Sequence, residues 1–176
     1  MGENELIIVD IEKCMGCRTC ELECALSHSY GRSIYQAIWE FPRPAKRIFV
    51  ESTGENAFPL QCRHCEDPPC AGVCPTGALS RDEEKQMVSL NQEKCIGCKY
   101  CIIACPFGVI FLHGDDKKIF KCDLCMETGD DLPACVGGCP TGAISFIPPE
   151  ELSKTKRREF MVEFLETRGS ATQNEQ

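Results

Sequence analysis

The sequence predicts an α+β fold of short hairpins and short helices, arranged as two small modules with one nested inside the other. Three observations support this prediction. Sixteen of the 176 residues are cysteines, about 9 % of the chain, which is typical of a scaffold held together by its cysteines. The other apolar residues make up only about a third of the chain, so an ordinary aliphatic core would be thin. The cysteines also recur in four groups of four, within stretches that repeat.

The four groups account for every cysteine. In chain order they are Cys14, Cys17, Cys20 and Cys24; Cys62, Cys65, Cys70 and Cys74; Cys95, Cys98, Cys101 and Cys105; and Cys122, Cys125, Cys135 and Cys139. The first and third groups have the spacing C-x2-C-x2-C-x3-C, and Pro106 completes the bacterial [4Fe–4S] motif in the third. Ala25 stands at the corresponding position of the first group. The second and fourth groups each widen one gap and end before a proline.

This spacing has a chemical reason. Three cysteines separated by two residues can curl round one iron cubane, and the fourth begins a helix that points away from it. In two-cluster proteins the fourth cysteine ligates the other cluster. A pair of groups therefore predicts one module that holds two clusters with crossed ligands.

An internal repeat indicates which groups pair. Residues 9–24 (VDIEKCMGCRTCELEC) resemble 90–105 (LNQEKCIGCKYCIIAC), and 70–80 (CAGVCPTGALS) resemble 135–145 (CVGGCPTGAIS). There are thus two kinds of group in alternation, and we expect each module to take one of each kind.

These pairs define the expected domains. The second and third groups lie close in sequence and predict an inner module at 62–105. Residues 1–24 together with 106–147 then form an outer module. The remaining segments are a spacer with a strand and a loop at 25–61, and a C-terminal helix and tail at 148–176.

The expected elements follow from local patterns. Alternating apolar residues predict strands at 7–10 and 87–90, each leading into a cysteine loop. Their hairpin partners are expected just after the two Pro-Thr-Gly turns, at 78–80 and 143–145. Further elements are expected as short helices at 20–27 and 101–105 and as a strand at 47–51.

A longer helix is expected at 149–166, where Pro148-Pro149 suits a helix start. Its apolar residues gather on one face. They are Leu152, Phe160, Met161, Phe164 and Leu165. We expect this face either to pack on its own domain or to dock on another subunit.

The net charge limits the function classes. Nineteen Lys and Arg residues against 27 Asp and Glu give a formal charge of −8, which argues against nucleic-acid binding.

No stretch approaches the roughly 20 apolar residues of a membrane-spanning helix, and the N-terminus lacks an export signal. We therefore expect a soluble cytoplasmic protein, with export as the passenger of a signal-bearing partner left open. In a reducing compartment, sixteen cysteines indicate metal ligands more than disulfides.

The cysteine motifs resemble a known family. The stretches CRHCEDPPCAGVCPTGA, KCIGCKYCIIACPFGVI and KCDLC…PACVGGCPTGA are similar to the four-cluster electron-transfer subunits of multisubunit oxidoreductases. These include the iron–sulfur subunits of dimethyl sulfoxide reductase, formate dehydrogenase and hydrogenase complexes. The segment from Cys14 through His28-Ser29 to Arg47-Ile48 most resembles the ferredoxin-like partners of carbon monoxide dehydrogenase and tungsten aldehyde oxidoreductases. The resemblance spans about residues 6–147 and departs from the family at Ala25 and in the short spacer.

The resemblance implies tandem bacterial-ferredoxin-like modules with four [4Fe–4S] clusters and a ligand set for each. The implied sets are Cys14, Cys17, Cys20 and Cys139; Cys24, Cys122, Cys125 and Cys135; Cys62, Cys65, Cys70 and Cys105; and Cys74, Cys95, Cys98 and Cys101. These sets agree with the pairing inferred from the repeat.

A chain with four fully ligated clusters is expected to be a non-catalytic electron carrier. A compact chain of this length is about 40 Å wide, which places neighbouring clusters about 10 Å apart. The expected partners are a large catalytic oxidoreductase subunit, of the tungsten or molybdenum-pterin or carbon monoxide dehydrogenase type, and a second redox partner. That second partner would be a flavoprotein, a ferredoxin or a membrane subunit.

Other interpretations stay open from the sequence. The protein could be a free diffusible polyferredoxin that serves several enzymes. Four-thiolate sites also suit zinc, which would make it an interaction scaffold. A disulfide framework and a catalytic cluster or thiol are weaker alternatives, because no Ser/His/Asp set, phosphate loop or paired carboxylates stand out.

Charged residues near the ligands are candidates for tuning the clusters. Each oxidised cubane with four thiolates carries about −2, which brings the loaded protein to about −16. Four cations next to cysteines could offset this charge, namely Arg18, Arg63, Lys99 and Lys121. The histidines His28 and His113 are expected to be loop residues, and His64 a hydrogen-bonding or surface residue beside a cluster.

Overall fold

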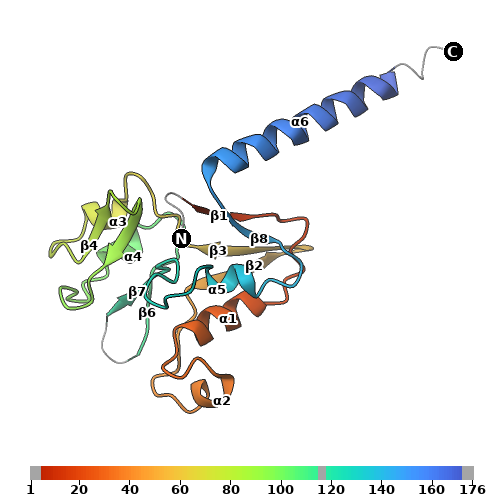
Figure 1. Ribbon diagram of the computed structural model, residues 1–176. Coiled ribbons are helices and arrows are strands. Elements are labelled where there is room, and N and C mark those ends of the chain that lie inside the picture. The colour runs from red at the N-terminus through yellow and green to blue at the C-terminus, as the bar shows by residue number, and fades with distance from the viewer. Residues whose placement is uncertain (1–4, 115–117, 172–176) are drawn as a thin grey trace.

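The computed structural model describes residues 5–114 and 118–171, with the side chains described up to residue 166. It is an α+β fold of two-stranded sheets connected by short helices and loops (Figure 1). The strands are β1 (Leu6–Val9), β2 (Ile48–Thr53), β3 (Asn56–Gln61), β4 (Leu79–Asp82), β5 (Met87–Leu90), β6 (Phe111–Leu112), β7 (Ile119–Phe120) and β8 (Ile144–Ile147). The helices are α1 (Thr19–Ser27), α2 (Ile34–Ala37), α3 (Pro69–Gly72), α4 (Tyr100–Ala104), α5 (Ala134–Gly137) and α6 (Pro149–Ala171).

Each of two strand pairs joins one segment from each of the two repeated kinds. β1 runs antiparallel to β8, with Leu6 opposite Ile147. β4 runs antiparallel to β5, with Leu79 opposite Leu90. Both hairpin partners expected after the Pro-Thr-Gly turns are therefore confirmed. The two ladders lie in different parts of the molecule (Figure 1).

Two apolar cores are present among the described residues, and cysteines form part of each. The first core contains Ile7, Ile48, Val50, Ala57, Ile144, Cys20, Cys24 and Cys135. The second contains Leu79, Val88, Ile110, Ile119, Cys70 and Cys101. Each core is small, as the composition predicted, and the thiol groups fill part of the volume that aliphatic side chains occupy in larger domains.

The spacer carries more structure than the sequence indicated. The strand expected at 47–51 is confirmed as β2, and it pairs with β3, which was not expected. Helix α2 was not expected either. Glu21 on α1 is buried and accepts a hydrogen bond of 2.7 Å from the Val50 N–H, which attaches the β2–β3 hairpin to α1.

Helix α6 begins at Pro149, confirming the predicted start, and continues to Ala171. It projects away from the rest of the molecule (Figure 1). Phe160, Met161 and Leu165 are exposed, so the expectation that this face packs on its own domain is wrong. The end of the predicted tail, residues 172–176, lies outside the described residues. No helix in the described part of the chain is long and apolar enough to cross a membrane.

Candidate iron–sulfur centres

The cysteine loops share one backbone turn. In the first and third groups Gly16 and Gly97 follow the pattern C-x-G-C and adopt φ of 69° and 68°. In the second and fourth groups the same position holds His64 and Leu124, which also adopt left-handed φ values of 46° and 57°. Left-handed backbone is unfavourable for residues with a side chain, so these loops are held in place by their surroundings.

The turns bring cysteines from distant parts of the chain together at three cavities. One is lined by Cys14, Cys17, Cys20 and Cys139, and we name these residues site I. A second is lined by Cys62, Cys65, Cys70 and Cys105, named site III. A third is lined by Cys74, Cys95, Cys98 and Cys101, named site IV. Four sulfurs around one cavity are the donor set of a [4Fe–4S] cubane.

The remaining four cysteines form site II, defined as Cys24, Cys122, Cys125 and Cys135. All four are buried. Burial raises the pKa of the Cys135 thiol, and the charges of Cys122, Cys24 and Cys125 raise it further. Cys24 and Cys135 pack in the first core, and α1 contacts α5, so these two sulfurs are neighbours, with Cys122 and Cys125 near enough to act on Cys135. Among the described residues, no three His, Cys, Asp or Glu side chains are arranged to hold a single metal ion.

Short helices connect the sites in pairs. Cys20 and Cys24 lie one turn apart on α1, so that α1 serves site I and site II. Cys135 lies on α5, which contacts α1, and Cys139 follows the helix. Helices α3 and α4 are in contact in the same way, and they carry Cys70 and Cys101 of sites III and IV. Helices from the first and fourth cysteine groups are thus in contact, and so are helices from the second and third groups.

The buried thiols favour a bound cation. Burial raises the pKa of Cys20 and of Cys70 to about 11, and it raises the pKa of Cys122 as well. A thiolate in such a place is costly unless a metal neutralises it. Some exposed sulfurs are stabilised locally instead, since the Thr19 hydroxyl donates to Cys17 at 3.4 Å and lowers its pKa.

A buried ion network lies beside site II, and none of the sequence motifs indicates it. His28 Nε2 donates to Asp123 Oδ1 at 3.0 Å, and Arg47 forms an ion pair of 2.6 Å with Asp123 Oδ2. His28 Nδ1 donates to the Cys24 carbonyl at 2.7 Å, and the Arg47 backbone N–H donates to Cys24 Sγ at 3.2 Å. His28 lies in the turn that follows α1, as expected for a loop residue, and it also takes part in this network, which was not expected. Hydrogen bonds to ligand sulfurs are one way in which a protein sets cluster potentials.

The charges in this network follow from its contacts. Burial alone would lower the pKa of His28, but its hydrogen bonds to Asp123 and Cys24 together outweigh burial and raise the pKa to about 9. Burial alone would raise the pKa of Asp123, but His28 and Arg47 hold it well below its usual range. At neutral pH the network therefore contains two cations and one carboxylate next to Cys24.

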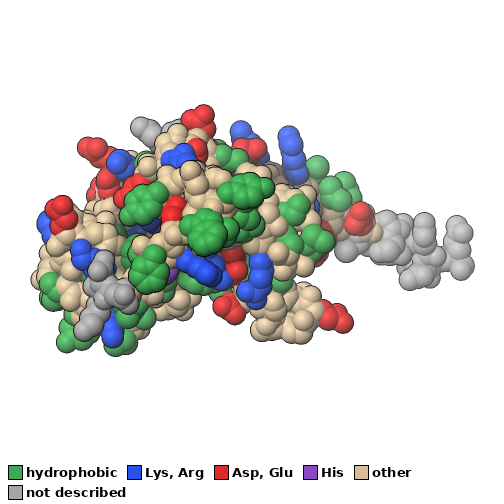
Figure 2. Space-filling model, turned by 90° about the horizontal axis from the view of Figure 1, so that it is seen from below, with side chains coloured by type: hydrophobic (Ala, Val, Ile, Leu, Met, Phe, Trp, Pro, Cys, Tyr) green, Lys and Arg blue, Asp and Glu red, His purple; other side chains and the backbone are tan. Residues whose placement is uncertain are grey.

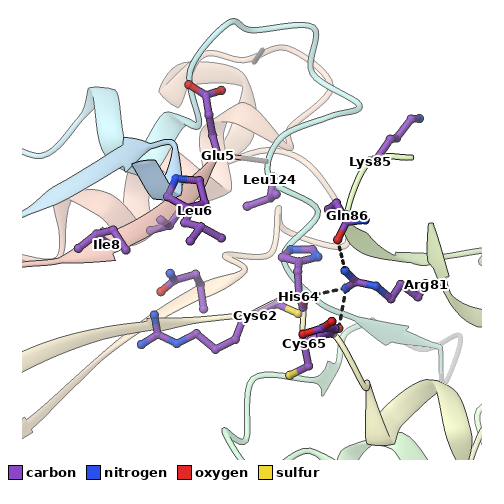
Figure 3. Close-up of a pocket in the computed structure, with 15 residues that line it drawn as sticks. Glu5, Leu6, Ile8, Cys62, His64, Cys65, Arg81, Lys85, Gln86 and Leu124 are labelled. Carbon is purple, nitrogen blue, oxygen red and sulfur yellow. Dashed lines mark hydrogen bonds between the residues drawn. The ribbon is translucent and has the colours of Figure 1, made fainter. Parts of the chain in front are cut away.

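The loop of site III is fixed by Arg81, another residue that the motifs did not identify. Arg81 donates to the carbonyl oxygens of His64 at 3.2 Å and Cys65 at 2.8 Å, and it also bonds Gln86 (Figure 3). His64 Nδ1 accepts a hydrogen bond of 3.1 Å from the Val88 N–H. Burial lowers the pKa of His64 to about 3, so its ring is neutral. His64 is a hydrogen-bonding residue beside the site, as expected. A cavity of about 550 Å³ adjoins this loop.

The four cations singled out in the sequence differ in environment. Arg18 and Lys99 are exposed, and Arg63 is half-buried with its guanidinium over the Phe58 ring. Lys121 is only 3 % exposed. Lys121 is thus the one of these four whose charge is shielded from water.

One face of the molecule carries large exposed apolar side chains. They form the aromatic patch, defined as Tyr30, Ile34, Tyr35, Ile38, Trp39 and Phe41. Trp39 is 85 % exposed and Phe41 is 88 % exposed. Figure 2 views the molecule from the side where α2 lies and shows hydrophobic side chains gathered there. Exposed apolar patches of this kind are typical of protein interfaces.

Comparison with known proteins points to the same chemistry. The model of the 4Fe-4S dicluster domain family matches residues 55–148. The chain is 40 % identical over 173 residues to the electron transport protein HydN of Escherichia coli K12, covering 88 % of this chain and 96 % of that protein.

Two further relatives are similar over most of their length. An iron-sulfur protein of Rhodospirillum rubrum is 39 % identical over 160 residues, covering 82 % of this chain and 83 % of the relative. The protein NrfC of Escherichia coli K12 is 36 % identical over 166 residues, covering 86 % of this chain and 70 % of the relative.

Proposed function

This chain belongs to the 4Fe-4S dicluster domain family and is an iron–sulfur electron-transfer protein, and on that premise we propose that it carries electrons through four [4Fe–4S] clusters. Each cluster, when bound, accepts one electron and passes it on. The chain supplies the ligands, keeps water away from the buried sulfurs and fixes the order of the sites. The observation that carries the proposal is the convergence of four cysteines at each of sites I to IV.

We propose that each site holds one cluster through its four cysteines. The support is that sites I, III and IV are cavities lined by four sulfurs each, and that the sulfurs of site II interact with one another. The number of cysteines also leaves none over for another role.

The order of electron transfer in this proposal is site I, site II, site III and site IV. Sites I and II share α1, and sites III and IV share the contact between α3 and α4. The link in the middle is supported by Cys122 of site II, whose thiol interacts with Cys62 of site III. With clusters held at all four sites, an electron that entered at one end site would leave at the other, and the protein would return to its starting state.

The domains in this proposal are two nested ferredoxin-like modules. The outer one comprises residues 1–24 and 106–147 and is closed by the β1–β8 ladder. The inner one comprises residues 62–105 and contains the β4–β5 ladder. Ile110 and Ile119 belong to the outer module, but they pack in the second core, with the apolar residues of the inner module. The outer segment that follows residue 105 therefore covers part of the inner module.

Metal analysis tests the number of clusters. We expect anaerobically purified protein to contain about sixteen iron and about sixteen acid-labile sulfide per chain, with brown colour bleached by dithionite. The variant Cys139→Ser is expected to lose the cluster of site I and retain about twelve iron. About eight iron in the unaltered protein would contradict four clusters. A colourless protein with stoichiometric zinc would favour the scaffold.

We propose that the chain is the non-catalytic subunit of a cytoplasmic oxidoreductase complex. Its partners would be a large catalytic subunit, of the tungsten or molybdenum-pterin or carbon monoxide dehydrogenase type, and a second redox protein. The aromatic patch supports this, because Trp39 and Phe41 are almost fully exposed and large exposed apolar patches are typical of protein interfaces. The cytoplasm would keep the sixteen thiols reduced until clusters are inserted.

Purification from the native source tests complex membership. We expect the chain to elute with one large subunit at constant ratio, and the double variant Trp39→Ser and Phe41→Ser to elute alone with its iron content unchanged. A second double variant, Phe160→Ser and Leu165→Ser, removes exposed apolar side chains from α6 instead, and comparing its elution with that of the first variant shows which surface binds the large subunit. An unaltered chain that elutes as a monomer would instead support a diffusible polyferredoxin.

A further inference from the structure

Lys121 occupies a position unlike that of any other lysine beside a ligand cysteine in the described chain. Three lysines immediately precede the first cysteine of a group: Lys13, Lys94 and Lys121. Lys13 and Lys94 are exposed, and Lys13 forms an ion pair of 2.7 Å with Asp10. Lys121 is buried, and its Nζ donates to the Cys122 carbonyl at 2.8 Å.

A buried ammonium group needs a negative partner. Removing it from water costs several kcal/mol unless an opposite charge lies close by. Among the described residues, the ion pairs found do not include Lys121, and its hydrogen bond goes to a neutral carbonyl. No carboxylate in the described part of the chain therefore lies within ion-pair distance of Lys121.

The groups around Lys121 are three carboxylates that line the same cavity, Asp82, Asp123 and Glu127, and cysteine sulfurs of two sites. On one side is Cys122 of site II, the next residue in the chain. On the other side is site III: burial raises the pKa of Cys62 and of Cys70, and the charge of Lys121 opposes that rise in both. The Lys121 charge therefore acts on the sulfurs of site III while the lysine is attached to a ligand of site II.

We propose that Lys121 is a positioning residue that neutralises part of the charge of the two inner sites and raises their reduction potentials. The inference rests on the proposed function, in which sites II and III are neighbours in the path of the electron. Each loaded site carries about −2, and an added electron makes it more negative. A fixed cation between them stabilises the reduced state of both and lessens their mutual repulsion, so that the middle transfer is not an uphill step.

The test is a redox titration of the full-length, cluster-loaded protein followed by EPR. In Lys121→Met we expect two of the four midpoint potentials to fall, with a decrease of about tenfold in the reduction equilibrium constant, equal to about 59 mV. The other two potentials are expected to stay unchanged. In Lys121→Arg, which keeps the charge, we expect all four to stay near those of the unaltered protein. Lys94→Met, an exposed lysine in the same sequence position, is expected to leave the inner two unchanged.

Two results would overturn the inference. One is a set of four unchanged potentials in Lys121→Met. The other is an equal change in Lys121→Met and Lys121→Arg, which would indicate that the shape of the side chain matters and its charge does not. Should the Met variant fail to assemble, Lys121→Gln replaces it, because Gln keeps an N–H for the Cys122 carbonyl. If both neutral variants fail while Arg assembles, the charge is required, as proposed; if Arg also fails, the inference is wrong.

The iron content separates this inference from the proposed function. About sixteen iron in the unaltered protein, together with unchanged potentials in Lys121→Met, would remove only the role of Lys121. About eight iron in the unaltered protein would remove the four-site path itself.

Discussion

At the scale of single residues, the cysteine loops show how one backbone turn is made by different side chains. Gly16 and Gly97 adopt the left-handed turn at little cost, whereas His64 and Leu124 adopt it with a Cβ atom present. His64 is held by its hydrogen bond from Val88, and Leu124 packs against the first core. The glycines were visible in the motif, but the equivalence of the other two residues becomes visible only in the backbone angles.

A substitution at Gly16 tests the need for this turn. We expect Gly16→Ala to destabilise the protein by about 1–2 kcal/mol, because φ is 69° and the new Cβ would lie 3.1 Å from the Ala57 Cβ. Gly72→Ala is the matched control, since a Cβ there meets nothing within 4 Å. Thermal unfolding monitored by circular dichroism measures both. Equal midpoints for the two variants would contradict the prediction.

The network of His28, Asp123 and Arg47 predicts a pH dependence. His28 has a pKa raised from 6.5 to about 9, so its protonated form stabilises the folded state. This contribution is fully present below about pH 6.5 and is lost as the pH rises through about 9. Asp123 has a lowered pKa, so its contribution is lost only in acid, as the pH falls below its unfolded value near 3.8.

The variant Asp123→Asn tests this network. At pH 6 we expect it to lose about 3 kcal/mol, because the cations of His28 and Arg47 then lack their buried partner. We also expect the thermal midpoint of the variant to vary less between pH 6.5 and 9 than that of the unaltered protein. Asp130→Asn, which breaks the exposed ion pair with Arg32, is the control and is expected to have little effect. The same slope with pH in Asp123→Asn and in the unaltered protein would refute the assignment.

At the scale of elements, the β2–β3 hairpin depends on a side chain from α1. Pro59 on β3 lies opposite Val50, at a place where the Val50 N–H points away from β3 and donates to Glu21. The proline therefore costs the ladder no hydrogen bond. Glu21 also forms an ion pair of 2.8 Å with Lys46, so it connects three segments.

Removing this carboxylate is expected to loosen the hairpin. In Glu21→Ala the Val50 N–H is buried without an acceptor, and we expect a loss of about 2 kcal/mol. The control is Glu51→Ala on the same strand, where the side chain is exposed. Hydrogen exchange at Val50 and the thermal midpoint measure the effect. Slow exchange at Val50 in Glu21→Ala would show that another group takes over as acceptor.

The elements differ in how well the sequence predicted them. The strands β1, β4, β5 and β8 and the helices α1 and α4 follow from the repeat and from apolar alternation, and they were expected. Strand β3 was not, because Pro59 within it argues against a strand unless the partner's N–H groups are known to point elsewhere. The ion network was hidden for another reason: 95 residues separate His28 from Asp123, and no local pattern links them.

At the scale of the whole molecule, the cores explain why the clusters should be needed for folding. Both cores contain cysteines as members, and their aliphatic residues are few. Burial raises the pKa of several of these thiols, so without metal they stay protonated. Four neutral thiols at a site do not attract one another, so they contribute little to holding the loops together. The protein therefore resembles small metal-binding domains, in which binding and folding are one process.

Cluster removal tests this coupling. We expect ferricyanide with a chelator to bleach the protein and abolish most of its far-ultraviolet circular dichroism, and anaerobic iron and sulfide to restore both. Helix α6 projects away from both cores (Figure 1). Helical signal that remains after bleaching is therefore assigned to α6 and does not count as evidence for folded cores. A bleached protein that keeps its strand signal would show that the two cores suffice without clusters.

The pairing of β1 with β8 has a consequence for how the protein is made. Cys14, Cys17 and Cys20 leave the ribosome about 120 residues before Cys139, a delay of roughly 6–24 s at bacterial rates of synthesis. During that interval the first site has three of its four sulfurs, while the inner module can already be complete. Maturation should therefore run from the inside outwards, and the earliest thiols of the nascent chain are the ones that wait longest, open to oxidation, for their metal.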